Sequence, residues 1–137
     1  MRFFVDTSSL FKKYVDEPGS DVFEKLVSKA SEIAVSPTTW IEVNVAIQRR
    51  LKTNLLTSER ADWLRTEIKK DFTYFFLVLW NENLESKAVE ITRQYALKTL
   101  DAVQLASGIL SKAEFFVTSD RQLYKAAKKV VPGVRFV

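Results

Sequence analysis

Five short runs of apolar and aromatic residues, separated by longer stretches with helical periodicity, constrain the fold of this chain more than any other feature. We predict strands at residues 2–5, 33–36, 72–80, 114–118 and 134–137. Short apolar runs of this kind are typical of strands buried on both faces of a sheet. Alternation of such strands with helices favours a sheet covered by helices on both sides. We therefore predict an α/β fold, a three-layer α/β/α sandwich with a short, mainly parallel sheet.

The stretches between these runs carry apolar residues at the three- and four-residue spacing of amphipathic helices. In residues 82–97, one stripe is formed by Leu84, Ala88, Ile91 and Tyr95. Further helices are predicted at residues 8–15, 21–33, 38–51, 58–72, 100–110 and 120–130. The chain has 137 residues, of which 47% are hydrophobic, which suits one domain with a sizeable core. Residues 1–137 are therefore treated as a single domain.

The sequence contains no histidine and no cysteine. This excludes thiolate nucleophiles, disulfides, zinc sites built on these residues and every triad that needs an imidazole base. Catalysis would have to rest on Asp, Glu, Lys, Ser, Thr or Tyr, with or without a hard metal ion. No apolar run approaches the roughly 20 residues of a membrane span, and the N-terminus lacks the pattern of a signal peptide. A cytoplasmic protein without a membrane partner is expected.

Four acidic residues stand at corresponding places in the predicted order of strands and helices. Asp6 directly follows the first strand, and Asp120 comes two residues after the fourth. Glu42 lies in the first turns of the helix that follows the second strand, and Asp101 lies at the start of the helix before the fourth. In an open parallel sheet these places lie at the carboxyl edge of the strands, where ligands bind. The sequence therefore predicts one acidic cluster assembled from remote parts of the chain.

Carboxylates crowded into one site repel each other, and a hard divalent cation relieves the repulsion. Mg²⁺ and Mn²⁺ prefer oxygen ligands, activate water and hold phosphate oxygens. None of this chemistry requires histidine. The formal net charge of +4 is compatible with a polyanionic partner without demonstrating one. The residue types are thus consistent with metal-assisted hydrolysis of phosphodiester bonds.

The same acids also fit structural roles at helix starts, which leaves a second interpretation open. Asp6 suits the cap of the first helix, a common role for aspartate. Residues 39–42 and 119–122 match the capping-box pattern. Asp101 and Asp120 would then be first-turn residues favoured by the helix dipole. A structural α/β domain whose acids are all caps is therefore an alternative to a metal site.

Four segments resemble, in order and spacing, the PIN-domain ribonucleases, and among them the VapC toxins of prokaryotic toxin–antitoxin pairs. The segments are FFVDTSSLFKKYVDEPGSD, VSPTTWIEVNVAIQRR, LKTLDAVQLASG and FFVTSDRQLYKAA. The resemblance spans nearly the whole chain. It implies a single PIN-like nuclease domain, a metal-dependent endoribonuclease activity, an RNA substrate, a cognate antitoxin and a homodimer.

By position, the acidic cluster of that family falls on Asp6, Glu42, Asp101 and Asp120. The resemblance makes these residues catalytic and assigns them as ligands of Mg²⁺ or Mn²⁺, with Glu42 either a ligand or the group that orients the attacking water. One departure is Gln104, where relatives often have histidine. That position is not usually a ligand, so the departure leaves the expected metal site unchanged.

Residues near the first and last acids are candidates for holding the substrate. They are Thr118, Ser119, Arg121, Lys12 and Lys13. A contact to a backbone phosphate needs only a positioned cation or hydrogen-bond donor. The basic residues 49–52 are more readily interpreted as a solvated helix end. A catalytically silent PIN-fold module that binds RNA or regulates a partner is the alternative function, and DNA remains a possible substrate.

Overall fold

The computed structural model describes all residues, 1–137. One parallel sheet has the order β3-β2-β1-β4-β5 and consists of β1 (Arg2–Val5), β2 (Glu32–Val35), β3 (Phe76–Leu77), β4 (Phe115–Thr118) and β5 (Val134–Phe136). The helices are α1 (Thr7–Leu10), the 3₁₀ helix η1 (Phe11–Lys13), α2 (Ser20–Val27), α3 (Thr39–Lys52), α4 (Ser58–Phe72), α5 (Glu82–Gln94), α6 (Thr99–Leu110) and α7 (Arg121–Val130). The predicted α/β/α sandwich is confirmed.

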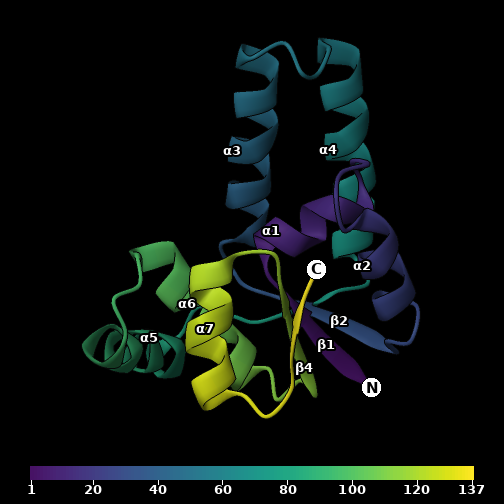
Figure 1. Cartoon of the computed structure of the whole chain (residues 1–137). Helices are drawn as coiled ribbons and strands as arrows, with labels where there is room; N and C mark the ends of the chain where they lie inside the picture. Colours follow the sequence, from purple (N-terminus) through teal and green to yellow (C-terminus); the bar gives the residue numbers. More distant parts are fainter.

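Alternate residues of the central strands face opposite sides of the sheet and build two separate cores. Phe3 and Val5 of β1 pack with residues of α1 to α4, whereas Phe4 between them packs with α5, α6 and α7. Figure 1 shows the second group of helices gathered on one side of the sheet, while α3 and α4 project from the other side as a hairpin. This alternation produces the three layers.

The strand predicted at residues 72–80 is wrong in its extent. Helix α4 continues through Phe72, and only Phe76 and Leu77 form the strand β3. Phe72 and Phe75 pack against each other in the hydrophobic core below α3 and α4 rather than extending the sheet. As the edge strand, β3 pairs only with β2, and its two side chains are exposed. The helix predicted at residues 8–15 is instead divided into α1 and η1.

The order of the strands reverses at the central strand, β1. The chain runs from β1 to β2 and β3 on one side and then crosses to β4 and β5 on the other. In open α/β sheets, ligands bind where the strand order reverses, outside the carboxyl ends of the strands. Asp6 follows β1 at this point, and its backbone N–H donates to Val117 of the neighbouring β4 at 3.1 Å. No helix is both long enough and apolar enough to cross a membrane.

Helix α6 lies unusually close to the sheet. A Cβ atom at Gly108 would come within 2.4 Å of the ring of Phe116 and within 3.2 Å of Phe4. Glycine is therefore required here by close approach, and it lets α6 pack directly on β1 and β4. This packing carries the first turns of α6, with Asp101 and Gln104, to the carboxyl edge of the sheet.

Candidate active site

Asp6 is buried at the junction of β1 and α1, with only 2% of its surface exposed. Its Oδ1 accepts hydrogen bonds from the backbone N–H of Ser9 at 2.9 Å and from the Ser9 hydroxyl at 2.7 Å. Its Oδ2 accepts from Thr118 at 2.5 Å, and the Ser8 hydroxyl lies 2.9 Å from both oxygens. Burial raises the pKa of Asp6 to about 6, although these hydrogen bonds lower it in part. The capping role predicted for Asp6 is confirmed.

Thr118, at the end of β4, links Asp6 to Asp120. Its hydroxyl donates to Asp6 and accepts from the backbone N–H of Asp120 at 3.0 Å. Asp120 is the N-cap of α7, because its Oδ1 accepts from the N–H of Leu123 at 2.9 Å. The N–H of Ser119 donates to Ser8 at 3.1 Å. Hydrogen bonds thus join the segments that carry the first and last acids.

Glu42 is held by donors from three separate elements. Its Oε2 accepts from the Thr7 hydroxyl at 3.1 Å, the Thr38 hydroxyl at 2.9 Å and Nε2 of Gln104 at 2.6 Å. Thr38 is the N-cap residue of α3, and its side chain makes no capping bond. The carboxylate therefore points across to α1 and α6 instead of closing the capping box suggested by residues 39–42.

Asp101 stands in the first turn of α6, half-buried and without a hydrogen-bond partner for its carboxylate. Burial raises its pKa, and the negative charges of Asp120 and Glu42 raise it further, whereas Lys98 lowers it. Asp101 therefore lies close enough to Asp120 and Glu42 for their negative charges to act on its carboxyl.

Glu42 and Asp120, but not Asp6 or Asp101, line a groove of about 430 Å³, which we call the acidic groove. It is lined by Thr7, Ser8, Thr38, Ile41, Glu42, Val45, Ala46, Arg49, Leu100 and Asp120. Ile41 and Leu100 are 66% and 46% exposed, so the groove has an apolar rim beside its acids. Arg49 supplies the positive charge in the lining.

The four acids do not form a finished coordination shell in this structure. No group of three or more Asp, Glu, His or Cys side chains is arranged to hold a metal ion. Asp6 makes no contact with the other carboxylates: Thr118 links it to the backbone of Asp120, and the hydroxyl of the neighbouring Thr7 donates to Glu42. None of the four takes part in an ion pair with lysine or arginine. The donor set consists of unneutralised oxygen ligands, which suits a hard divalent cation.

The structure places the predicted substrate residues in different surroundings. Thr118 and Ser119 lie beside the acids, as described above. Arg121 follows Asp120 and has its guanidinium 4.9 Å from the ring centre of Phe136. By contrast, Lys12 pairs with Glu17 and Lys13 with Asp71, and both lysines line a different pocket. The structure does not bring these two lysines to the acidic groove.

Gln104 is the residue whose role the sequence did not reveal. Its side chain is 2% exposed and connects Glu42 with Thr7 and Thr39 through Nε2, while Oε1 is buried without a partner. A buried amide three residues after Asp101 on an apolar helix was the available signal. Its partners lie 62 to 97 residues away in the sequence, so pattern alone could not identify them.

The buried carboxyl of Asp6 should make the stability of the metal-free protein depend on pH. Its folded pKa of about 6 exceeds the ordinary value of 3.8, so the folded state binds the proton more tightly than the unfolded state does. The contribution of Asp6 to the free energy of unfolding therefore falls as pH rises from about 4 to 6 and stays low above that, a change of about 3 kcal/mol.

We test this with urea unfolding of wild type and Asp6→Asn in EDTA between pH 4 and 8. The free energy of unfolding of the variant, relative to wild type, should increase up to about pH 6 and then level off. A difference that stays constant over this range would contradict the assignment of a buried carboxyl with a raised pKa to Asp6.

The PIN domain family matches residues 3–129, and the chain belongs to this family. Solved structures agree in fold. VapBC-1 from nontypeable Haemophilus influenzae has a TM-score of 0.72 at 11% identity, covering 99% of this chain and 98% of that one. A toxin–antitoxin complex from Klebsiella pneumoniae has a TM-score of 0.69 at 19% identity, covering 96% and 94%.

A third similar structure is VapC20 from Mycobacterium tuberculosis, described as a toxin that cleaves the sarcin-ricin loop. It has a TM-score of 0.70 at 19% identity, covering 90% of this chain and 94% of that one. At these identities the likeness is one of fold, and a shared fold does not by itself transfer an activity. No curated protein matches the sequence.

Proposed function

We propose that this chain is a metal-dependent endoribonuclease that hydrolyses RNA phosphodiester bonds and acts as the toxin of a toxin–antitoxin pair. The observation that supports the proposal is that Glu42 and Asp120 line one groove, with Asp101 near enough to feel both charges, and that no lysine or arginine pairs with these acids in a PIN-family chain. In open α/β sheets, ligands bind where the strand order reverses, and this is where these acids lie.

Asp6, Asp101 and Asp120 would hold Mg²⁺ or Mn²⁺, and Glu42 would either hold the ion or orient the attacking water. When bound, the ion supplies Lewis acidity and an activated water. The chain itself supplies positioning. Thr118 and Ser9 hold Asp6 in one orientation, and the donors on Glu42 hold that carboxylate toward α1 and α6.

Cations and hydroxyls around the acids would hold the phosphate backbone. Arg49 lines the acidic groove and Arg121 adjoins Asp120, so both are suited to phosphates flanking the scissile bond. The hydroxyls of Thr118 and Ser119 belong to the same edge. Lys12 and Lys13 would contribute only if the substrate extended past η1, because their present partners are Glu17 and Asp71.

An antitoxin and a second copy of the chain are the protein partners we propose. The similar structures include toxin–antitoxin complexes, and the rim of the acidic groove exposes Ile41, Val45 and Leu100. Elsewhere on the surface, Leu79 and Trp80, which follow β3 in the sequence, are 66% and 55% exposed. Apolar side chains gathered on a surface favour burial by a protein partner. We place this activity in the cytoplasm.

The proposal is tested by incubating the protein with a mixed RNA pool in Mn²⁺, in Mg²⁺ and in EDTA, with single-stranded DNA as the control substrate. We expect cleavage of RNA that requires the metal and is absent in EDTA. RNA binding without cleavage in any of these conditions would contradict the nuclease and favour the catalytically silent PIN-fold module.

Gln104 should affect this activity through Glu42. Replacement by leucine removes the 2.6 Å donor to Glu42 and leaves the volume nearly unchanged. Loss of a group that orients a site carboxylate typically costs 10- to 100-fold, so we expect kcat to fall by about that factor. Gln104→His, which keeps an N–H donor, should recover most of the rate. Equal activity of the leucine variant and wild type would contradict the positioning role.

A further inference from the structure

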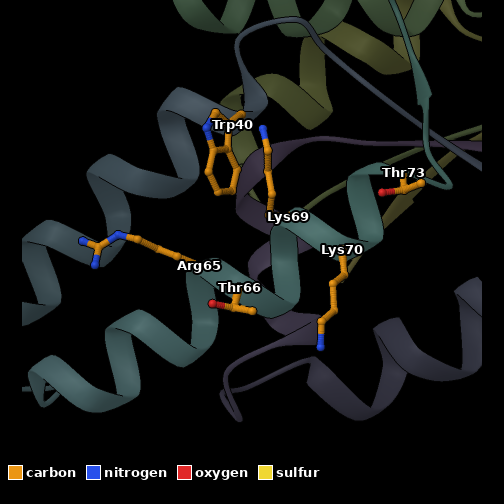
Figure 2. A pocket seen from close by; sticks show the side chains of 6 residues that line it. All are labelled: Trp40, Arg65, Thr66, Lys69, Lys70 and Thr73. Carbon is orange, nitrogen blue, oxygen red and sulfur yellow. The ribbon is translucent and has the colours of Figure 1, made fainter.

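A second hollow lies between the two helices of the projecting hairpin, and we call it the basic pocket. It has a volume of about 560 Å³ and is lined by Trp40, Arg65, Thr66, Lys69, Lys70 and Thr73. Figure 2 shows Trp40 of α3 facing Lys69, with the remaining residues contributed by α4 and the turn after it. The lining contains three cations and no acid.

The structure holds two of these cations in place before any ligand binds. The ammonium of Lys69 lies 4.7 Å from the ring centre of Trp40, a cation–π distance. The indole is itself packed edge-on against Phe72, with ring centres 5.6 Å apart. On the other side, Nε of Arg65 donates to the side chain of Asn44 at 3.2 Å. Less conformational freedom is then lost when an anion binds.

The acids nearest the basic pocket neutralise it only weakly. Arg65 pairs with Asp62 at 3.3 Å, but the Asp62 side chain is 79% exposed. Lys70 pairs with Glu67 at 3.1 Å, and the Lys70 side chain is 66% exposed. Exposed pairs one helical turn apart contribute little and exchange readily for other anions. Lys69 has no acidic partner. The positive charge is therefore available to a ligand.

The basic pocket and the acidic groove lie on different flanks of the same helix. Glu42, Val45 and Arg49 of α3 line the acidic groove, whereas Trp40 and Asn44 belong to the side that faces α4. An α-helix with its side chains is about 10 Å across, so a few nucleotides of single-stranded RNA can span the two sites. The carboxylates of the groove repel a polyanion, so much of the binding energy for RNA must come from cations outside it.

We propose that the basic pocket binds backbone phosphates of the RNA whose scissile bond lies in the acidic groove. This inference rests on the proposed function, because it takes RNA as the substrate. Arg65, Lys69 and Lys70 would contact phosphate oxygens, and the hydroxyls of Thr66 and Thr73 would donate to them. Contacts to phosphates do not distinguish the bases. The basic pocket therefore contributes to RNA affinity and positions the RNA, but it does not select the RNA sequence.

The test compares two triple variants that lose the same charge. The first replaces Arg65, Lys69 and Lys70 with glutamine, and the second replaces Lys25, Lys29 and Lys125, three exposed lysines that line neither site. Binding of a fluorescent 20-nucleotide RNA is measured in EDTA over a range of salt concentrations. Cleavage of a two-nucleotide RNA in Mn²⁺ is measured separately, because its single phosphodiester bond leaves no phosphate for the basic pocket, and thermal unfolding checks the fold of each variant.

We expect the first triple to bind the long RNA about tenfold more weakly than wild type at 0.1 M salt, with a salt slope shallower by about 2, as for three lost phosphate contacts. The control triple should lose less than about threefold, and all three proteins should cleave the short RNA alike. Equal loss of binding in the two triples would overturn the inference. So would unchanged RNA binding together with loss of binding to a polyglutamate peptide, which would indicate a protein ligand. Absence of cleavage by every protein overturns the nuclease, while the binding comparison still decides the basic pocket.

Discussion

Replacement of Asp6 by asparagine is expected to slow metal-dependent RNA cleavage at least about a thousandfold while the fold is retained. In the proposed function Asp6 is a metal ligand, and loss of one ligand charge forfeits several kcal/mol of stabilisation of the reacting groups, where each 1.4 kcal/mol corresponds to a factor of ten. The amide keeps an oxygen that accepts from the N–H of Ser9, so the cap of α1 persists. The measurement is single-turnover cleavage in Mn²⁺, with unfolding by urea as the check on the fold.

Two further variants make this result decisive. Asp21→Asn replaces an exposed acid of α2 and should cleave at the wild-type rate. Asp101→Asn changes a carboxylate that makes no hydrogen bond, so it should reduce cleavage without loss of stability. Wild-type activity in both site variants would contradict the catalytic assignment. A loss of stability in Asp6→Asn with unchanged metal response would favour a purely structural cap.

The second large effect is on stability. Gly108→Ala should lower the free energy of unfolding by about 3 kcal/mol, the upper end of the range for overpacking a core. The added Cβ meets Phe116 at 2.4 Å, and this ring is stacked on Phe4 with centres 5.1 Å apart. Phe4 and Phe116 are 0% and 1% exposed, so neither ring has free space into which to move. The better helix propensity of alanine recovers at most about 1 kcal/mol.

A double variant identifies the clash as the cause. Phe116→Leu in the Gly108→Ala background shortens the opposing side chain, so the two losses should be less than additive, as expected for residues in contact. Urea unfolding of the four proteins measures the coupling. Strict additivity, or a Gly108→Ala variant as stable as wild type, would contradict the close packing of α6 on the sheet.

The order of strands and helices was sufficient to predict the layers of the fold and the edge of the sheet at which the acids gather. This worked because Asp6 comes directly after β1 and Asp120 two residues after β4, and the apolar residues of both strands are unambiguous. The prediction of a strand at residues 72–80 was wrong in its extent. Phe72, at the end of α4, and Phe75, in the turn that follows, pack in the core without being part of a strand, so their aromatic character did not indicate the secondary structure.

The finer structure of the site depends on contacts between distant residues. Gln104 reaches Glu42 and Thr7 only because the glycine at position 108 lets α6 approach the sheet. Likewise, the pairing of Trp40 with Lys69 requires α3 and α4 to pack side by side. Such pairings are set by the tertiary fold, and no local pattern of one sequence encodes them.

Binding of Mn²⁺, followed by isothermal titration calorimetry on protein freed of metal, tests the acidic site most directly. Wild type should bind at least one ion with millimolar or better affinity, and the double variant Asp101→Asn, Asp120→Asn should bind at least about tenfold more weakly. The same stoichiometry and affinity in both proteins, or RNA cleavage that persists in EDTA, would contradict a metal site built from these carboxylates.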